Sequence, residues 1–320
     1  MPLDHFVSQV HLRRFYSPSL VNRLYAISKK DMKQFSPSSK DVCRIEDGST
    51  NAYLKEDRAV EEFLKTIEPN YNTAVEKLFD NKIDRECIYT IAGFVSYIHA
   101  CSPAGMRIHS RLLQAKSEME YFMADSQGLF PAPPPELGGM NLTEILKKGI
   151  VKIDIDPKFP QAIGITSILK NAAMFGNFKW ELLHNGFADS AYFTSDFPIA
   201  IEKSVDMDVM NKIVPLSPTL AIRIRPDRQI NREHADFTFA NFNYQCKRLK
   251  REQVAQINRL IVRCAEEVVF FRDNHPWVVE LVRRNRKYRM ELRTDTTPIG
   301  NGMAMFYSET IAETPKSIGG

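Results

Sequence analysis

The chain contains no long hydrophobic run. No apolar stretch approaches the roughly 18 to 20 residues that span a bilayer, so we expect no membrane segment. Asp4 and His5 lie where a secretory signal needs a basic end and an unbroken apolar stretch. With 320 residues, 43% of them hydrophobic and 26% charged, the composition is that of an ordinary globular protein. We therefore expect a cytoplasmic protein.

Paired cysteines and glycine-rich phosphate loops are also missing. No two of the five cysteines are close enough in sequence to form a Cys-x-x-Cys pair. This spacing predicts reduced, mostly structural thiols and argues against a thiolate zinc site. The sequence has no internal repeat and neither a Walker nor a dinucleotide-binding glycine motif, which excludes the common nucleotide-binding folds that depend on one.

Positive charge is concentrated in the last third of the chain. The net charge is only +4, yet residues 247–293 hold thirteen basic residues against six acidic ones. Such a surplus predicts an acidic partner, either a nucleic acid or an acidic protein. The alternative is an ordinary solvated helix face. The residues that we expect to bind nucleic acid are Lys247, Arg248, Lys250, Arg251, Arg283, Arg284, Arg286 and Lys287.

Helical periodicity dominates the first half of the chain. A short strand is expected at 21–28, a surface loop at 29–49, and an amphipathic helix over 52–78 that bends near Pro69. Asp84 can cap the next helix, and Pro103 suits the first turn of the one after it. The Pro/Gly-rich segment 130–139 predicts a linker. Helical character resumes at 141–148 and 157–184.

The second half changes to the period of β-strands. Short β-branched or aromatic runs occur at 191–195, 199–202, 213–216, 220–224 and 237–242. Two long helices, 250–271 and 276–288, and a strand at 303–307 are expected to follow. We predict an α+β fold, predominantly helical, with a small antiparallel sheet built mainly from residues 190–245. Residues 1–320 are expected to form a single large domain, with the lobes 1–128 and 140–310 as the alternative.

Several short motifs together resemble one protein family. They are His5-x-x-x-Gln9-x-x-Leu12-Arg13-x-Phe15, the pair Glu61 and Glu68, Ser195-Asp196-x-Pro198, Pro215-Leu216-Ser217-Pro218, and Ile257-Asn258 before Ala265. The chain resembles the bacterial domain of unknown function family 4238 from residue 5 to about 271. Ser8 departs from the pattern, since the family often has Pro before the Gln. The resemblance implies a family but no established activity.

Glu61 and Glu68 are candidate catalytic residues. They lie seven positions, or two helical turns, apart, and so project from roughly the same face. Two carboxylates there could hold a divalent metal such as Mg²⁺ or act as acid and base. They could equally be exposed charges or partners for Arg13 and Arg107, and we favour the interpretation as structural salt bridges.

Asp196 is the acidic residue that we single out first. It follows a buried-looking run, 191–195, and precedes Pro198, so it is expected in a turn at the end of a strand. Rigid scaffolds often place catalytic or ligand-binding residues at such positions. The alternative is an Asx turn, in which the carboxylate only satisfies backbone donors.

His5 and Arg13 complete the candidate set. His5 could move protons near neutral pH, and Arg13 could point inward to a carboxylate or phosphate. His, Arg, Glu and Asp side chains are the groups that phosphodiester hydrolysis needs, although a buried polar network uses the same residues. The sequence therefore favours a nucleic-acid-directed hydrolase, such as a nuclease effector of a bacterial defence or toxin system. A non-catalytic regulatory or adaptor protein and a small-nucleotide hydrolase are the alternatives.

Overall fold

Helices and strands contribute comparably to the fold. The structure is a computed structural model that describes residues 3–131, 133, 135–204, 209–231, 233, 235–300 and 302–314. Helices account for 38% and strands for 24% of it. The expected α+β class is confirmed. The expectation of a predominantly helical chain with one small antiparallel sheet is wrong, because several sheets are present and one is mixed.

The largest sheet has five strands in the order β10-β5-β9-β8-β7. Their bounds are Lys179–His184 (β5), Ala200–Lys203 (β7), Met210–Ser217 (β8), Leu220–Arg225 (β9) and Asn243–Arg248 (β10). β10 runs parallel to β5, and the other neighbours are antiparallel. Helical structure expected over 157–184 therefore ends at Asn177, and the residues after it form β5. The strand expected at 237–242 forms instead at Asn243–Arg248, as β10.

A four-stranded sheet has the order β3-β2-β11-β6. It consists of Tyr25–Ser28 (β2), Gln34–Phe35 (β3), Thr194–Ser195 (β6) and Val268–Phe271 (β11). The single helix expected over 250–271 is wrong, because the helix ends at Cys264 and β11 lies inside this sheet. The β-branched and aromatic residues of β11 suit a strand buried between neighbours. A two-stranded pair, Leu3–His5 (β1) and Arg44–Glu46 (β4), lies nearby.

The helices pack around these sheets on a single hydrophobic cluster that extends from Phe6 to Met290. α4 is buried along almost its whole length and packs against α3 and α8, and α3 also contacts β5. As expected, Asp84 caps α4 by accepting a bond from the Cys87 N–H at 2.9 Å, and Pro103 lies in the first turn of α5. The bounds are Gln9–Arg13 (α1), Ala59–Ile67 (α2), Tyr71–Phe79 (α3), Arg85–Cys101 (α4), Pro103–Ser126 (α5), Leu142–Lys147 (α6), Lys158–Thr166 (α7), Ile168–Asn177 (α8), Arg251–Cys264 (α9) and Pro276–Asn285 (α10).

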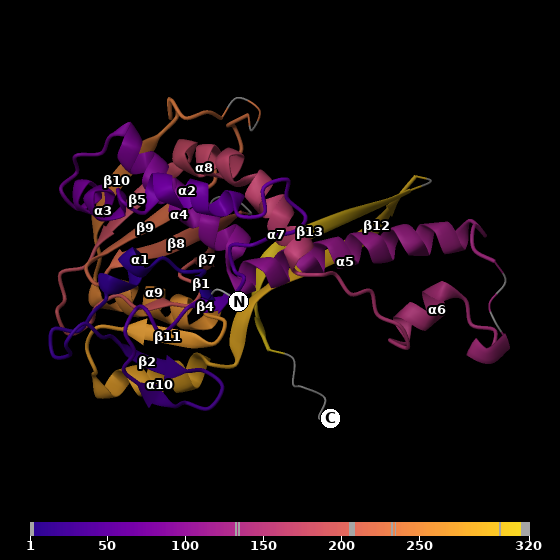
Figure 1. Ribbon diagram of the computed structural model, residues 1–320, viewed down its shortest axis with the longest axis horizontal. Coiled ribbons are helices and arrows are strands. Elements are labelled where there is room, and N and C mark those ends of the chain that lie inside the picture. Colours follow the sequence, from indigo (N-terminus) through magenta and orange to yellow (C-terminus); the bar gives the residue numbers. More distant parts are fainter. Residues whose placement is uncertain are drawn as a thin grey trace.

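An arm projects from this body (Figure 1). It consists of the outer part of α5, the segment around α6, and the long hairpin formed by Tyr288–Ile299 (β12) and Gly302–Glu313 (β13). α5 packs against both β12 and α6. The Pro/Gly-rich segment 130–139 joins α5 to α6 and includes a short 3₁₀ turn at Pro135–Leu137, while residues 132 and 134 lie outside the described residues.

His11 fixes the amino-terminal segment in the core. Its ring is fully buried and stacks on Phe94, with 4.9 Å between the ring centroids. Nδ1 lies 2.7 Å from the Tyr71 hydroxyl, and Nε2 lies 2.7 Å from the Thr194 hydroxyl. One imidazole therefore connects α1, α3 and β6. Burial, assisted by the charge of Arg14, lowers the pKa of His11 to about 3.

This lowered pKa predicts a specific loss of stability in acid. Between pH 6.5 and about 3 the unfolded chain binds a proton at His11 that the folded chain does not, so the free energy of unfolding falls as pH falls. The contribution is at most about 1.4 kcal/mol per pH unit. Denaturant titrations of the wild type and His11→Gln from pH 7.5 to 4 measure it. We expect His11→Gln to be less stable at pH 7.5 and the difference to narrow in acid. A constant difference at every pH would contradict this account.

Candidate functional site

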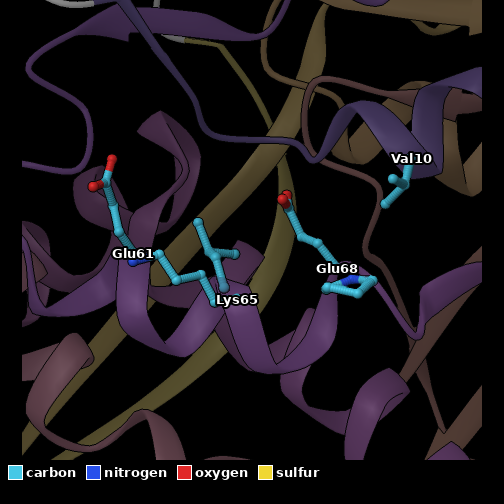
Figure 2. A pocket seen from close by; sticks show the side chains of 6 residues that line it. Val10, Glu61, Lys65 and Glu68 are labelled. Atoms are coloured by element: carbon cyan, nitrogen blue, oxygen red, sulfur yellow. The ribbon is translucent and has the colours of Figure 1, made fainter.

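Glu61 and Glu68 line one groove, as their spacing predicts. Figure 2 shows both carboxylates rising from the same side of α2, with Val10 of α1 beyond Glu68. Glu68 follows directly after the last residue of α2. Leu64, Lys65 and Pro69 complete the wall of a depression of about 480 Å³.

Both carboxylates in this groove already have partners. Arg58 binds Glu61 through Nε at 2.9 Å and also reaches Asp4 at 3.3 Å. Glu68 accepts a hydrogen bond from the Ser8 hydroxyl. The prediction that Arg13 and Arg107 pair with Glu61 and Glu68 is wrong. Arg107 binds Glu266 and Glu291, and Arg13 donates to Gln9. These contacts attach the amino-terminal segment to α2.

His5 and Arg13 lie apart from one another. His5 is in β1, where Nε2 donates to the Ser39 carbonyl at 3.1 Å and the backbone carbonyl accepts from the Tyr97 hydroxyl at 2.6 Å. Burial lowers the pKa of His5, although the bond to Ser39 opposes that shift. Arg13 is exposed at the end of α1 and donates to Gln9 at 3.1 Å. Neither residue lines the α2 groove or the cavity that contains Asp196.

Asp196 lines a different cavity, of about 490 Å³. Segments from five parts of the chain meet there. The wall consists of Phe6, residues 42–45, Pro103, Asp196, residues 266–268 and Phe270. We call this space the Asp196 cavity. Of the five candidate catalytic residues, only Asp196 belongs to it, so the structure does not gather the five around one pocket.

Three backbone N–H groups hold the Asp196 carboxylate. Oδ1 accepts from Glu266 at 2.9 Å, and Oδ2 accepts from Glu267 at 2.7 Å and Val268 at 3.0 Å. Burial raises the pKa of Asp196 to about 6, and these bonds and the charge of Lys29 counteract part of the shift. Oδ1 still has capacity for another hydrogen bond. The Asp196 carboxylate therefore holds the backbone of residues 266–268 in place, and it also changes its protonation state close to neutral pH.

Buried basic groups compensate most of the negative charge beside this cavity. Lys29 interacts electrostatically with Asp196 and donates to the Tyr288 carbonyl at 2.7 Å and to that of Ala265. Burial lowers the pKa of Lys29 to about 8, while the charge of Asp196 raises it. Arg107 binds both carboxylate oxygens of Glu266 at 2.8 Å.

Two charged lining residues remain free of ion pairs. In the described part of the chain, no opposite charge lies within ion-pair distance of Arg44 or of Glu267. Both side chains are exposed at the cavity. Sequence reasoning missed them, along with Lys29. Arg44 lies in a segment expected to be a surface loop, and Glu267 lies within an expected helix. Neither position has a sequence pattern that would indicate a binding site.

A metal site receives no support from the donor geometry. Among the residues that the structure describes, no group of three or more His, Cys, Asp or Glu side chains is arranged to hold a metal ion. A pair of carboxylates holds a divalent cation only when further oxygen atoms complete the coordination shell of the ion. The expected Mg²⁺ therefore stays a prediction.

The basic residues predicted to bind nucleic acid form two separate groups. Lys247 and Arg248 end β10, and Lys250 and Arg251 lie just after it at the start of α9. The α10 group lies at the other end of α9, where Arg263 binds Asn285 at 2.7 Å. A helix of 14 residues separates the groups by about 20 Å. Five of the eight are in ion pairs, namely Lys247, Arg251, Arg283, Arg284 and Lys287. Arg286 donates to the Lys30 carbonyl at 2.8 Å.

The fold and the cavity together define an α+β protein in which segments distant in the sequence line a cavity of small-molecule size. The chain belongs to the family described as "Protein of unknown function (DUF4238)", whose model matches residues 4–275. α10 and the β12–β13 hairpin lie beyond that match. Comparisons with curated proteins and with solved structures give no match. In the described residues, no helix has the length and apolar character to cross a membrane.

The bonds to Asp196 predict graded losses of stability. Asp196→Ala leaves three N–H groups without an acceptor and Lys29 without its counter-charge, so we expect a loss of about 3 to 5 kcal/mol. Asp196→Asn retains one acceptor oxygen and should lose less. Asp189→Ala, which breaks an exposed ion pair with Arg251, is the control and should change little. Chemical denaturation measures all three. Equal stability of Asp196→Ala and the control would refute this role.

Proposed function

We propose that the protein is a hydrolase of a small nucleotide bound in the Asp196 cavity. The observation that carries the proposal is the chemistry of the lining, where a buried carboxylate lies beside two free charges of opposite sign. A volume of about 490 Å³ lies in the usual range for small-ligand sites, about 300 to 1,000 Å³. Double-stranded nucleic acid would not fit.

Each lining group has a role in this proposal. Arg44 binds a phosphate, because guanidinium and phosphate form paired, charge-assisted hydrogen bonds. Glu267 accepts hydrogen bonds from ribose hydroxyl groups. Phe6 and Phe270 supply apolar wall on which the base rests.

Asp196 acts as the general base. Its carboxylate takes a proton from a water molecule while the water oxygen bonds to phosphorus. The bond from phosphorus to the leaving oxygen breaks, and that oxygen takes up a proton from solvent. A carboxyl group with a pKa close to 6 is suited to this step, because it is ionised at neutral pH and still basic.

Nucleic-acid hydrolysis and a purely regulatory role receive less support from the geometry. The first requires a continuous basic surface, and the basic residues lie in two groups that are largely paired with acids. The second does not account for the free charges at the cavity. A bacterial defence or toxin role remains a prediction that rests on no contact described above.

Removal of the Arg44 charge should weaken nucleotide turnover. A panel of mono-, di- and cyclic nucleotides is incubated with the protein, with and without Mg²⁺, and products are measured by chromatography. For a nucleotide that is turned over, we expect Arg44→Ala to lower kcat/KM by about 10- to 100-fold. Lys40→Ala replaces an exposed residue four positions before Arg44 that does not line the cavity; this control should be as active as wild type. Absence of both turnover and calorimetric binding across the panel would sink the proposal.

The pKa of Asp196 predicts the acid limb of the rate profile. The ionised carboxylate is the active form, so kcat/KM should be constant above about pH 7. It should fall about tenfold per pH unit below the pKa of about 6. Glu267→Gln should lower kcat/KM but retain this limb. A profile that stays flat down to pH 5 would exclude Asp196 as the base.

A further inference from the structure

Three adjoining hollows lie around the ends of α3, β5 and β10, which are side by side in the body (Figure 1). Their volumes are about 390, 280 and 210 Å³. The largest meets the second at Phe79, His184 and Arg248, and it meets the third at Asn185 and Phe187. We call this extended surface the β10 groove. It shares no lining residue with the Asp196 cavity.

The charged side chains that line the β10 groove are all basic. They are Lys247, Arg248 and Arg272, and no Asp or Glu of the described chain lines it. Lys247 and Arg272 already have partners, Glu181 and Asp273. The charge available to a ligand is therefore that of Arg248.

Arg248 ends β10 with an exposed side chain at the junction of the two larger hollows. Among the described residues, no hydrogen bond or ion pair holds its guanidinium group. Two acidic residues close in sequence to the groove are paired elsewhere, Asp80 with Lys82 at 3.2 Å and Asp189 with Arg251. A free guanidinium group is well suited to bind phosphate, through paired and charge-assisted hydrogen bonds.

Aromatic rings lie on both sides of this free charge. Phe79 is 45% exposed, and its ring centroid lies 5.4 Å from that of His184. Phe187 borders the largest and the third hollow, with the guanidinium group of Arg251 4.8 Å from its ring centroid. Proteins that hold single strands combine such rings, on which bases stack, with cations that contact the phosphates. A duplex keeps its bases paired and stacked, so it does not offer them to the rings.

We propose that the β10 groove binds single-stranded nucleic acid, with a backbone phosphate on Arg248 and the adjacent base stacked on Phe79. The hollows continue on both sides of Arg248, which favours a chain of nucleotides over a single one. A run of Asp and Glu side chains would also meet Arg248, but it offers no ring to Phe79. This binding goes beyond the hydrolysis proposed for the Asp196 cavity and does not depend on it.

Fluorescence anisotropy with a labelled oligothymidylate of about 12 nucleotides tests the proposal on the full chain. Arg248→Ala should raise the Kd about tenfold at low salt and reduce the slope of log Kd against log salt by about 0.7. Phe79→Ala should raise the Kd about tenfold at every salt concentration, because it removes stacking rather than charge.

Two matched controls should bind like wild type. Arg259→Ala removes an exposed arginine of α9 that has no ion pair among the described residues. Phe159→Ala removes a phenylalanine of α7 that is 43% exposed and lies outside the groove. Circular dichroism verifies that each variant is folded. Affinity that either Arg248→Ala or Phe79→Ala leaves unchanged would overturn the proposal.

Competition identifies the class of ligand. A duplex of the same length, thymidine 5′-phosphate and polyglutamate should each compete at least about tenfold more weakly than the single strand. Equal competition by any of them, or no binding of the oligonucleotide at about 50 mM salt, would refute the assignment. Arg248 does not line the Asp196 cavity, so Arg248→Ala should retain wild-type turnover of nucleotides. The failure of one proposal is thereby distinguishable from the failure of the other.

Discussion

The hydrogen bonds of the Asp196 carboxylate are the interaction on which both the four-stranded sheet and the Asp196 cavity depend. Asp196 lies one residue beyond β6 and binds three successive N–H groups at the start of β11. Lys29, just after β2, donates to the Ala265 carbonyl of the same turn and to the Tyr288 carbonyl at the start of β12. The ends of β2, β6 and β11 are thereby held together. A buried charge is tolerated only when it is paired and fully hydrogen-bonded, and here the bonds that meet this need also form the cavity wall.

The amino-terminal segment is attached in a similar way. Asp4 accepts from Arg58 and from the Ser49 N–H, Ser8 donates to Glu68, and His11 bonds two hydroxyl groups in the core. A terminus is usually poorly ordered unless it is tied down, and these polar contacts tie it to α2, α3 and β6. Its density of polar residues thus has a structural cause. These contacts also position Phe6, which forms part of the wall of the Asp196 cavity. The amino-terminal segment therefore shapes the cavity through packing.

The sequence predicted local features well and pairings poorly. The cap at Asp84, the first-turn Pro103 and the shared face of Glu61 and Glu68 depend on residues a few positions apart. By contrast, 179–184 and 268–271 became strands because partners distant in the chain pair with them. Short apolar runs are compatible with either a buried helix or a strand, and only the tertiary context decides. The same limit concealed Arg44 and Glu267, whose common cavity is assembled from segments more than two hundred positions apart.

Charge pairing determines which surfaces remain available for binding. The basic residues of 247–293 form a single run in the sequence, but in the structure Glu181, Asp189, Glu280 and Glu313 pair with five of the eight that were expected to bind nucleic acid. The charges that remain without an ion pair are fewer, and they indicate what each surface can bind. At the Asp196 cavity they are one charge of each sign, which suits a small ligand with both an anionic group and hydrogen-bond donors.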